Sequence, residues 1–484
     1  MKVFPPPISN AAELEKAKNF IEQCQEIIGT EYVYLSDADK SPFLTDWSKR
    51  FTGEALAVLR PKNTNEVAAL AALCHSENIA IVPQGGNTGL CGGATPSKNS
   101  HCIVISTSRL NRIRELDLEN STITLDAGVV LMNAQEAAVK VGKLFPLSLA
   151  AEGSCTIGGN LSTNAGGVQV LRYGNMRDLC LGIELVTPTG EIFNGLRGLR
   201  KDNTGYSLKD LYIGAEGSLG IITAATLKLY PLPKSRVTAL VSIQSVRAGI
   251  QLIDLARESS NADLTAFELI STRALRLVAK RAKNIESFSS TESDWVVLLE
   301  FSSMEAENIN RERLENLLGR ALELELIADA VIANSIQQSK DLWSIREGIP
   351  EAQFELGTVI KHDISLPISQ IASFVEDTEV KLQQLWPKMQ TIIFGHVGDG
   401  NLHYNLAPLS PNLSNDIEER RNSINQLVHD QVYAHLGSFS AEHGIGQSKR
   451  DELPLRKSNV EMELMRSIKK ALDPKNIMNP GKVL

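Results

Sequence analysis

Short apolar runs and glycine-rich turns alternate through the first half of the chain. Residues 11–28 have the spacing of an acidic amphipathic helix, and Thr64 is placed to cap a second helix. The same pattern predicts strands over 55–59, 79–82, 103–106, 122–126 and 221–229, and a helix near 131–142. The inward face of the helix that begins at Thr64 is apolar, formed by Val67, Leu70, Ala71 and Cys74.

The pattern changes after residue 233, because the run Tyr230-Pro231-Leu232-Pro233 ends the last of these strands. Apolar strands at 237–243, 295–301 and 391–396 then alternate with charged helices at 304–325 and 415–436. A helix over 459–472 precedes a proline-ended tail, which we expect to dock on the rest of the protein. We therefore predict an α+β protein with an N-terminal helical segment (1–50), a first domain (51–233), a second domain (234–455) and a C-terminal segment (456–484).

Composition bears on the partners, the location and the cysteine chemistry to be expected. The 484 residues include 57 acidic and 49 basic side chains, a net charge of -8, which disfavours nucleic acid as a partner. No apolar run approaches the ~20 residues of a membrane span, and the first residues lack the apolar core of a signal peptide, so a cytoplasmic location is expected. All six cysteines lie before residue 181 and are expected to be reduced, structural thiols.

Three glycine-rich passages in the first domain carry the clearest chemical signal, at 83–94, 152–174 and 205–220. Glycines let the backbone approach a ligand and point several N–H groups at one anion. Neither a G-x-G-x-x-G fingerprint nor a P-loop occurs, so several separate loops indicate a long dinucleotide such as FAD, which the residues alone do not identify. The candidate cofactor-binding residues are Pro83, Gly85, Gly86, Asn87, Thr88, Gly89, Leu90, Gly153, Ser154, Thr156, Ile157, Gly158, Gly159, Asn160, Asn164, Gly166 and Gly167.

Histidines gather in the second domain. His396 and His403 flank a glycine turn between two apolar stretches, and Glu442 directly precedes His443. Two imidazoles and one carboxylate form a three-ligand set with open positions, the pattern of a catalytic metal site. Isolated histidines at turns are the structural alternative. Arg346 and Lys361 each follow apolar residues and could hold a substrate carboxylate.

Several of these motifs, in this order, resemble a known family. The passages 83–94, 144–177 and 205–223 are similar to the flavin domain of the vanillyl-alcohol oxidase type, also called PCMH-type. The blocks 396–403, 441–446 and 479–482 are similar to the matching C-terminal half. Over residues 45 to 484 the chain thus resembles the FAD-dependent D-2-hydroxyacid dehydrogenases, most of all those acting on D-2-hydroxyglutarate. D-lactate dehydrogenases and the glycolate oxidase FAD subunit are relatives.

The resemblance implies a two-part FAD-binding domain, an α+β substrate domain and a C-terminal segment that returns to the FAD domain. FAD is expected to be non-covalent, because no histidine stands in the first glycine loop. It further implies a divalent metal, usually zinc, on His396, His403 and Glu442. By the same resemblance, Glu216, Gly220, Ile221 and Asn479 join the FAD cradle, Asn405, Arg346, Lys361 and His443 contact substrate, and His443 acts as the general base.

The implied reaction is metal-assisted oxidation of a D-2-hydroxy acid to the 2-oxo acid, with hydride transfer from C2 to flavin. Electrons would leave to a separate acceptor such as an electron-transfer flavoprotein or a quinone, and a homodimer would match the commonest enzyme assembly. One departure from the family pattern is Pro350, at a position where a carboxylate-binding threonine is expected. D-lactate, D-malate and glycolate therefore stay open as substrates, as do a metal-dependent hydrolase and a non-catalytic flavin subunit.

Overall fold

The structure is a computed structural model that describes residues 11–98, 100–279 and 293–484. The chain divides into two compact units. Unit 1 comprises the described residues up to Gly166, then Asn175–Tyr230 and His443–Leu484. Unit 2 comprises Gly167–Gly174 and Pro231–Glu442. Among the described residues, no helix is both long and apolar enough to cross a bilayer.

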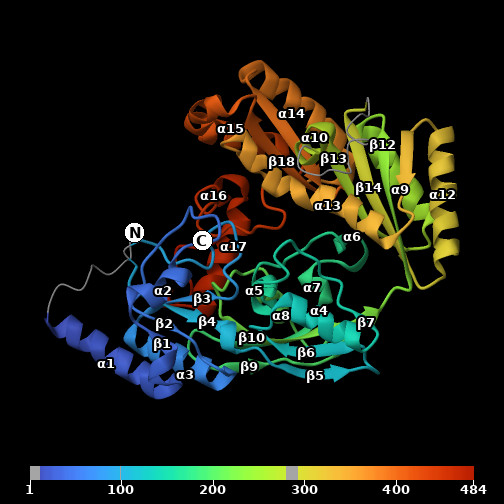
Figure 1. The fold of residues 1–484 in the computed structure, drawn as a ribbon. Helices are drawn as coiled ribbons and strands as arrows, with labels where there is room; N and C mark the ends of the chain where they lie inside the picture. The colour runs from blue at the N-terminus through green and yellow to red at the C-terminus, as the bar shows by residue number, and fades with distance from the viewer. Residues whose placement is uncertain (1–10, 99, 280–292) are drawn as a thin grey trace. The chain divides into compact units, whose positions relative to one another are not determined.

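Unit 1 contains a four-stranded and a five-stranded sheet with helices packed against them, and β7 pairs separately with β11 (Figure 1). The first has the order β1-β2-β4-β3, with β3 and β2 parallel to β4, and the second is the antiparallel β5-β6-β10-β8-β9. The elements, in chain order, are α1 (Ala11–Ile28), β1 (Val33–Tyr34), α2 (Asp37–Leu44), β2 (Val58–Leu59), α3 (Thr64–Glu77), β3 (Ala80–Gln84), β4 (Cys102–Ser106), β5 (Ile113–Asp117), β6 (Thr122–Asp126), α4 (Leu131–Lys140), β7 (Lys143–Leu144), α5 (Ile157–Ser162), α7 (Met176–Leu179), β8 (Cys180–Val186), β9 (Ile192–Asn194), α8 (Lys209–Tyr212), β10 (Ile221–Lys228), β11 (Tyr230–Pro231), α16 (Leu453–Arg456) and α17 (Asn459–Leu472).

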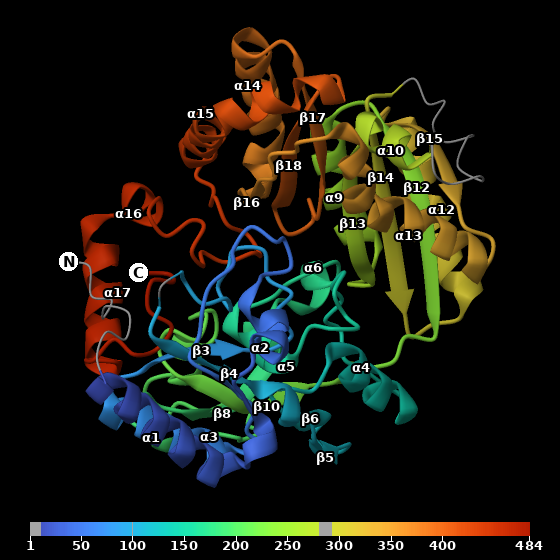
Figure 2. The same cartoon turned by 60° about the vertical axis from the view of Figure 1, so that its left-hand side comes forward.

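The amphipathic helices form as their patterns predict. Helix α1 buries Phe20 and Cys24 in the same core as Leu70 and Cys74 of α3, and the two helices lie side by side (Figures 1 and 2). One detail of the prediction is wrong, because the N-cap of α3 is Asn63, whose side chain accepts a hydrogen bond from the Glu66 N–H.

All six cysteines are free and buried, which confirms the prediction of structural thiols. Burial raises the pKa of Cys24 and of Cys180 to about 12.

The C-terminal segment docks on unit 1, as expected of the tail. Helix α17 occupies the predicted residues, and a capping box between Ser458 and Glu461 fixes its start. The tail then pairs with β3, since the Ile81 N–H donates to Ile477 O (2.7 Å) and the Asn479 N–H donates to Ile81 O (2.7 Å). Residues 443–455, which the sequence pattern assigned to the second domain, also belong to unit 1.

Unit 2 is built around a seven-stranded antiparallel sheet with the order β15-β12-β14-β13-β17-β18-β16. Helices cover both faces, so its central strands read as apolar runs rather than as alternating patterns. Its elements are α6 (Val170–Tyr173), β12 (Ser235–Ile243), α9 (Val246–Ser259), β13 (Leu264–Ser271), α10 (Thr272–Ala279), β14 (Trp295–Ser303), α12 (Glu307–Glu323), β15 (Ile327–Ile332), α13 (Ile336–Ala352), β16 (Asp363–Ser365), α14 (Ile371–Leu385), β17 (Met389–Gly395), β18 (Asn401–Pro408) and α15 (Ser414–Ala434).

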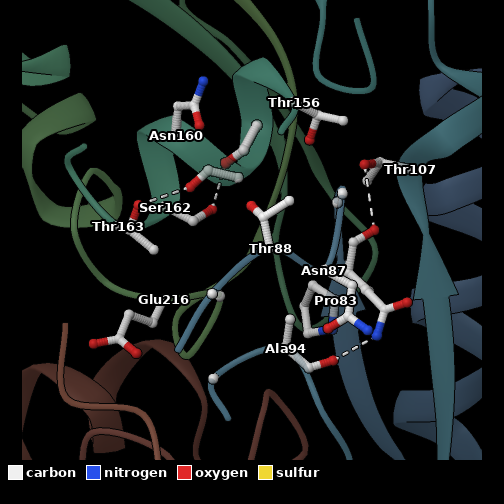
Figure 3. A pocket seen from close by; sticks show the side chains of 18 of the residues that line it. Pro83, Asn87, Thr88, Ala94, Thr107, Thr156, Asn160, Ser162, Thr163 and Glu216 are labelled. Carbon is white, nitrogen blue, oxygen red and sulfur yellow. Dashed lines mark hydrogen bonds between the residues drawn. The ribbon is translucent and has the colours of Figure 1, made fainter. Parts of the chain in front are cut away.

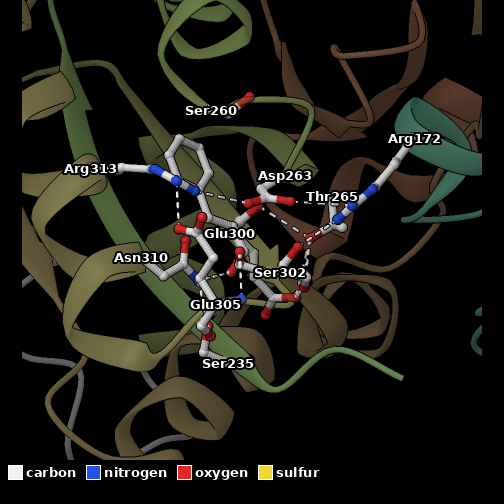
Figure 4. A network of polar contacts seen from close by, with 12 residues as sticks. Arg172, Ser235, Ser260, Asp263, Thr265, Glu300, Ser302, Glu305, Asn310 and Arg313 are labelled. Atoms are coloured by element: carbon white, nitrogen blue, oxygen red, sulfur yellow. Dashed lines mark hydrogen bonds and ion pairs between the residues drawn. The ribbon is translucent and has the colours of Figure 1, made fainter. Parts of the chain in front are cut away.

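A short early segment belongs to this later unit. Residues 167–174 carry Arg172, whose guanidinium forms an ion pair with Asp263 (3.2 Å) and donates to Ser302 O (2.5 Å) (Figure 4). Asp263 also pairs with Arg313 (3.2 Å). These contacts explain why residues 167–174 belong to unit 2, although the rest of their glycine passage belongs to unit 1. The sequence pattern did not predict this division.

Candidate active site

A cavity in unit 1 opens where the three glycine passages converge (Figure 3). Strand β3 delivers the first passage, the turn before α5 delivers the second, and the turn before β10 delivers the third. Thirteen of the predicted cofactor residues line this cavity: Pro83, Gly85, Gly86, Asn87, Thr88, Gly89, Thr156, Gly158, Gly159, Asn160, Glu216, Gly220 and Ile221.

Two glycines of the first passage lie so close to the second passage that an added side chain would clash. A methyl group at Gly85 would lie 2.4 Å from Thr156 Oγ1, and one at Gly86 would lie 2.1 Å from the carbonyl oxygen of Ser154. At position 86 the obstacle is backbone, so only glycine lets the first and second passages come this close, whereas a methyl group at position 85 would have to displace the Thr156 hydroxyl.

The cavity also contains polar groups that fit a ligand. Thr156 Oγ1 and Asn160 Nδ2 are buried and have no hydrogen-bond partner among the described residues. Buried polar atoms are normally satisfied, so these two indicate a bound polar group. Together with glycine backbone that can face phosphates, they fit the FAD that the sequence predicts.

Other predicted residues lie outside the cavity lining. They are Leu90, Gly153, Ser154, Ile157, Asn164, Gly166, Gly167 and Asn479. Asn479 is nevertheless close, because its side-chain amide donates to Gly93 O (2.9 Å) and to Glu216 O (2.7 Å) and so ties two of the loops together. The hydroxyls of Thr107, Ser162 and Thr163 also line the cavity and were not predicted, because none of these residues stands beside a glycine.

Glu216 anchors the turn after His443, a structural role that the sequence motif does not indicate. Its carboxylate accepts hydrogen bonds from the N–H groups of Ile445 (2.7 Å) and Gly446 (2.8 Å). Burial raises the pKa of this carboxyl, and the two N–H donors oppose the shift. The bonds fix the turn that follows His443, and His443 itself lines the cavity.

In unit 2, a hairpin brings two predicted metal ligands together. Strands β17 and β18 pair with Phe394 opposite His403, and His396 follows β17 directly. The ring centroids of His396 and His403 are 6.0 Å apart. Glu442 completes the cluster, with ligand atoms of all three residues within 4.8 Å of one another.

Glu442 is held in place through its backbone. Its N–H donates to Asp363 Oδ2 (2.9 Å), and the other oxygen of Asp363 accepts from the side-chain amide of Asn401 (2.9 Å). Burial raises the pKa of the Glu442 carboxyl to about 7, with Asp363 and Asp399 adding to the shift and His396 opposing it. This carboxyl is thus poorly compensated without a cation.

Glu268 lies at the back of the cluster, and no sequence motif marks it. This fully buried carboxylate contacts His396 Nδ1 through Oε1 (2.5 Å) and Arg346 Nε through Oε2 (2.7 Å). Burial opposes its ionisation, yet the charges of His396 and Arg346 prevail and lower the pKa of Glu268 to about 2. Despite burial, the contact with Glu268 raises the pKa of His396 to about 9.

The donor set fits a divalent cation. Because Nδ1 of His396 faces Glu268, its Nε2 is turned toward Glu442, 3.8 Å away. A ligating histidine with its second nitrogen on a carboxylate is the usual arrangement in zinc proteins. Two imidazoles and one carboxylate also match the ligand set of catalytic zinc.

The predicted substrate residues have different surroundings. Arg346 is buried in α13 with its guanidinium carbon 4.8 Å from the centre of the Phe394 ring, whereas Lys361 is exposed beside Phe354. Asn405 is buried, and its side chain accepts from the His362 N–H (3.1 Å) and donates to Gln353 (2.9 Å). Pro350 lies within α13, on the same helix as Arg346.

Comparisons with known proteins agree with this architecture. Residues 55–195 match the model of the FAD binding domain, and residues 232–483 match that of the C-terminal domain of FAD linked oxidases. The chain is 38% identical to the mitochondrial D-2-hydroxyglutarate dehydrogenase of Arabidopsis thaliana, covering 95% of this chain and 80% of that protein. It is 35% identical to a putative mitochondrial D-lactate dehydrogenase of Schizosaccharomyces pombe (96% and 89% covered).

Solved structures support the fold. p-Cresol methylhydroxylase aligns with a TM-score of 0.77 at 15% identity, over 99% of this chain and 98% of that one. Alkyldihydroxyacetonephosphate synthase aligns with a TM-score of 0.75 at 17% identity (99% and 86% covered). The two-part flavin fold expected from the sequence is therefore confirmed. With this fold, both family models and relatives that match along nearly its whole length, the chain belongs to the FAD-dependent D-2-hydroxyacid dehydrogenases.

Proposed function

We propose that the protein oxidises a D-2-hydroxy acid to the corresponding 2-oxo acid, with D-2-hydroxyglutarate as the preferred substrate. One observation carries this proposal: Glu268 contacts both His396, one of three candidate metal ligands, and the buried Arg346. A 2-hydroxy acid presents a chelating hydroxyl and carboxylate to a cation and, in the case of hydroxyglutarate, a second carboxylate to a cationic side chain. The relatives named D-2-hydroxyglutarate dehydrogenase favour that substrate.

The residues of unit 2 would bind and orient the acid. His396, His403 and Glu442 would hold a divalent cation, for which we propose zinc. Arg346 would bind a carboxylate, since its guanidinium is fixed by Glu268 and is always charged. Lys361 and Asn405 remain secondary candidates for substrate contact. Fixing two ends of the acid would set the orientation of its C2 hydrogen.

His443 would take the hydroxyl proton. It follows the proposed ligand Glu442 in the chain, and Glu216 fixes the turn that carries it. Imidazole accepts a proton near neutral pH, as a general base requires. When bound, the cation supplies Lewis-acid polarisation of the hydroxyl, and non-covalent FAD supplies the acceptor for the C2 hydride. Loss of one proton and one hydride converts the hydroxy acid into the 2-oxo acid.

A separate acceptor must then reoxidise the flavin, and we propose an electron-transfer flavoprotein or a quinone for this step. A homodimer is the assembly we propose from the base rate among enzymes. The cytoplasmic location expected from the sequence stays a prediction, and the plant and yeast relatives are named mitochondrial.

A D-lactate dehydrogenase is the second candidate, because Pro350 offers no hydroxyl to a second carboxylate. Turnover of the isolated chain with an artificial dye as acceptor separates the candidates. We expect kcat/KM for D-2-hydroxyglutarate to exceed that for D-lactate at least about tenfold, since one additional charged contact contributes about 1.5–3 kcal/mol.

The reverse ranking would assign D-lactate instead. A chain that reduces no dye with any D-2-hydroxy acid would indicate the non-catalytic flavin subunit. A colourless protein that hydrolyses esters or amides would indicate the metal-dependent hydrolase.

A further inference from the structure

We propose that Glu268 is the positioning residue of this site, which fixes the metal ligand His396 and the carboxylate binder Arg346 through its two oxygens. This inference rests on the proposed function, because it assigns a role toward the cation and the substrate proposed there. It adds a residue for which neither the sequence motifs nor the comparisons provide a role.

The strand places Glu268 on the correct face of the sheet. In β13 the neighbouring Phe267 and Leu269 point into the core under α9, whereas Ile270 points into the opposite core with α10 and α13. Side chains alternate along a strand, so Glu268 shares the face of Ile270. Helix α13, which carries Arg346, covers that face. An ionised carboxylate at 0% exposure is tolerated there only because both of its oxygens are paired.

The contact with His396 selects the nitrogen that can bind metal. The carboxylate accepts the Nδ1–H of the ring, which leaves Nε2, on the side of Glu442, as the ligand nitrogen. Without an acceptor at Nδ1, neutral imidazole could place its proton on either nitrogen. Glu268 therefore determines the tautomer as well as the ring orientation.

The contact with Arg346 determines which edge of the guanidinium meets the substrate. Glu268 occupies Nε, and the ring of Phe394 lies 4.8 Å from the guanidinium carbon. A substrate carboxylate must then bind at the Nη groups. One buried side chain thus couples the positions of the cation and of the carboxylate.

A second buried carboxylate on the adjacent strand serves as a comparison. Glu300 of β14 lies opposite Ala266 of β13 and is also buried. It accepts hydrogen bonds from Trp343 Nε1 (2.9 Å) and Thr238 (3.2 Å). It also accepts from Thr265 (3.4 Å) and Ser302 (3.2 Å), which Figure 4 shows beside it. None of these partners belongs to the proposed metal or substrate set, so Glu300 reports the structural cost of altering a buried glutamate in this sheet.

The isosteric change Glu268→Gln tests the role most sharply. An amide has one acceptor oxygen and one NH2 donor, so it cannot accept from both His396 and Arg346. Arg346 can only donate hydrogen bonds, whereas the Nδ1 of His396 can become an acceptor if the ring changes tautomer. The amide oxygen should therefore face Arg346, and the NH2 group should force His396 into the Nε2–H form, which cannot ligate a metal through Nε2.

The experiment measures zinc binding to the FAD-loaded, zinc-stripped full chain by competition with a chromophoric chelator. We expect Glu268→Gln to weaken the zinc Kd 10–100-fold. The control Glu300→Gln should stay within about threefold of wild type, and Glu268→Asp should restore part of the affinity because it retains a carboxylate. Equal Kd values for wild type and Glu268→Gln, or equal losses in both glutamine variants, would overturn the inference while leaving the proposed function intact.

Wild-type protein that binds no zinc and needs no divalent cation would overturn this inference and the cation site of the proposed function, whereas oxidation of a D-2-hydroxy acid is tested separately by turnover with the dye. Nitrogen NMR of the zinc-loaded wild type, with the signal assigned by its loss in His396→Asn, gives a test that needs no altered Glu268. We expect His396 to be metal-bound at Nε2 and protonated at Nδ1. The opposite assignment would contradict the role of Glu268 even if every variant at that position fails to fold.

Discussion

Replacing His443 by asparagine is expected to lower kcat/KM for the D-2-hydroxy acid 10²–10⁴-fold, the usual contribution of a general base. Asparagine is close in size and can form hydrogen bonds, but it cannot take a proton at neutral pH. The flavin content should stay at the wild-type level, because Glu216 holds the adjacent turn through the N–H groups of Ile445 and Gly446 and not through the imidazole.

Steady-state turnover with a dye acceptor, with the flavin absorbance measured on the same samples, checks this result. His435→Asn is the matched control, since His435 lies at the end of α15 and bonds to Gln431 O (2.8 Å) and Asp377 (3.2 Å). It should retain near wild-type turnover. A His443→Asn variant that keeps more than about a tenth of kcat/KM would refute the assignment of the base.

Changing Gly86 to alanine is expected to weaken flavin binding about 100-fold. The added methyl group would lie 2.1 Å from Ser154 O, so the first and second glycine passages would have to separate. Overpacking of this kind costs about 3 kcal/mol, which corresponds to about two orders of magnitude in affinity. The purified variant should be nearly colourless, and added FAD should restore activity only at high concentration.

Gly319→Ala provides the control. No heavy atom lies within 4 Å of a methyl group at Gly319, which lies on α12 and is not among the residues that line the cavity. Its flavin Kd should remain within about threefold of wild type. Equal flavin affinity in both alanine variants would show that close contact at Gly86 does not shape the cradle.

The cradle could be predicted from sequence because its signal is local. Glycine at 85, 86, 158 and 159 beside Thr156 is visible in the chain itself, and three such passages in one domain indicate one ligand. The hairpin of His396 and His403 was predictable for the same reason, as two apolar stretches around a glycine turn. The residues that complete these sites, such as Thr107 and Ser162, reach them only through packing.

Glu268 shows why the remaining part of the site was not predictable. In the sequence it is a single acidic residue in an apolar strand, with no motif around it. Its partners His396 and Arg346 lie 128 and 78 residues away and meet it only when β17 and α13 pack against β13. The available signal was the presence of a charge in a run buried on both faces, which requires a partner.

Two local predictions failed for related reasons. Thr64 looked like the cap of α3, but its hydroxyl is used by the distant carboxylate Glu184, and Asn63 takes the capping position. Residues 167–174 were assigned to the first domain with the rest of their glycine passage, but they belong to unit 2, where Arg172 forms an ion pair with Asp263. In both cases a long-range polar contact determines the local structure.

The most direct test of the account is an anaerobic titration of the purified protein with the D- and L-forms of 2-hydroxyglutarate, malate and lactate, followed by flavin absorbance near 450 nm. Bleaching of the oxidised flavin band by D-forms, at the lowest concentration for D-2-hydroxyglutarate, with no bleaching by L-forms, is the result we expect. A yellow protein that none of the D-acids reduces, or one that the L-forms reduce equally well, would contradict oxidation of D-2-hydroxy acids as its function.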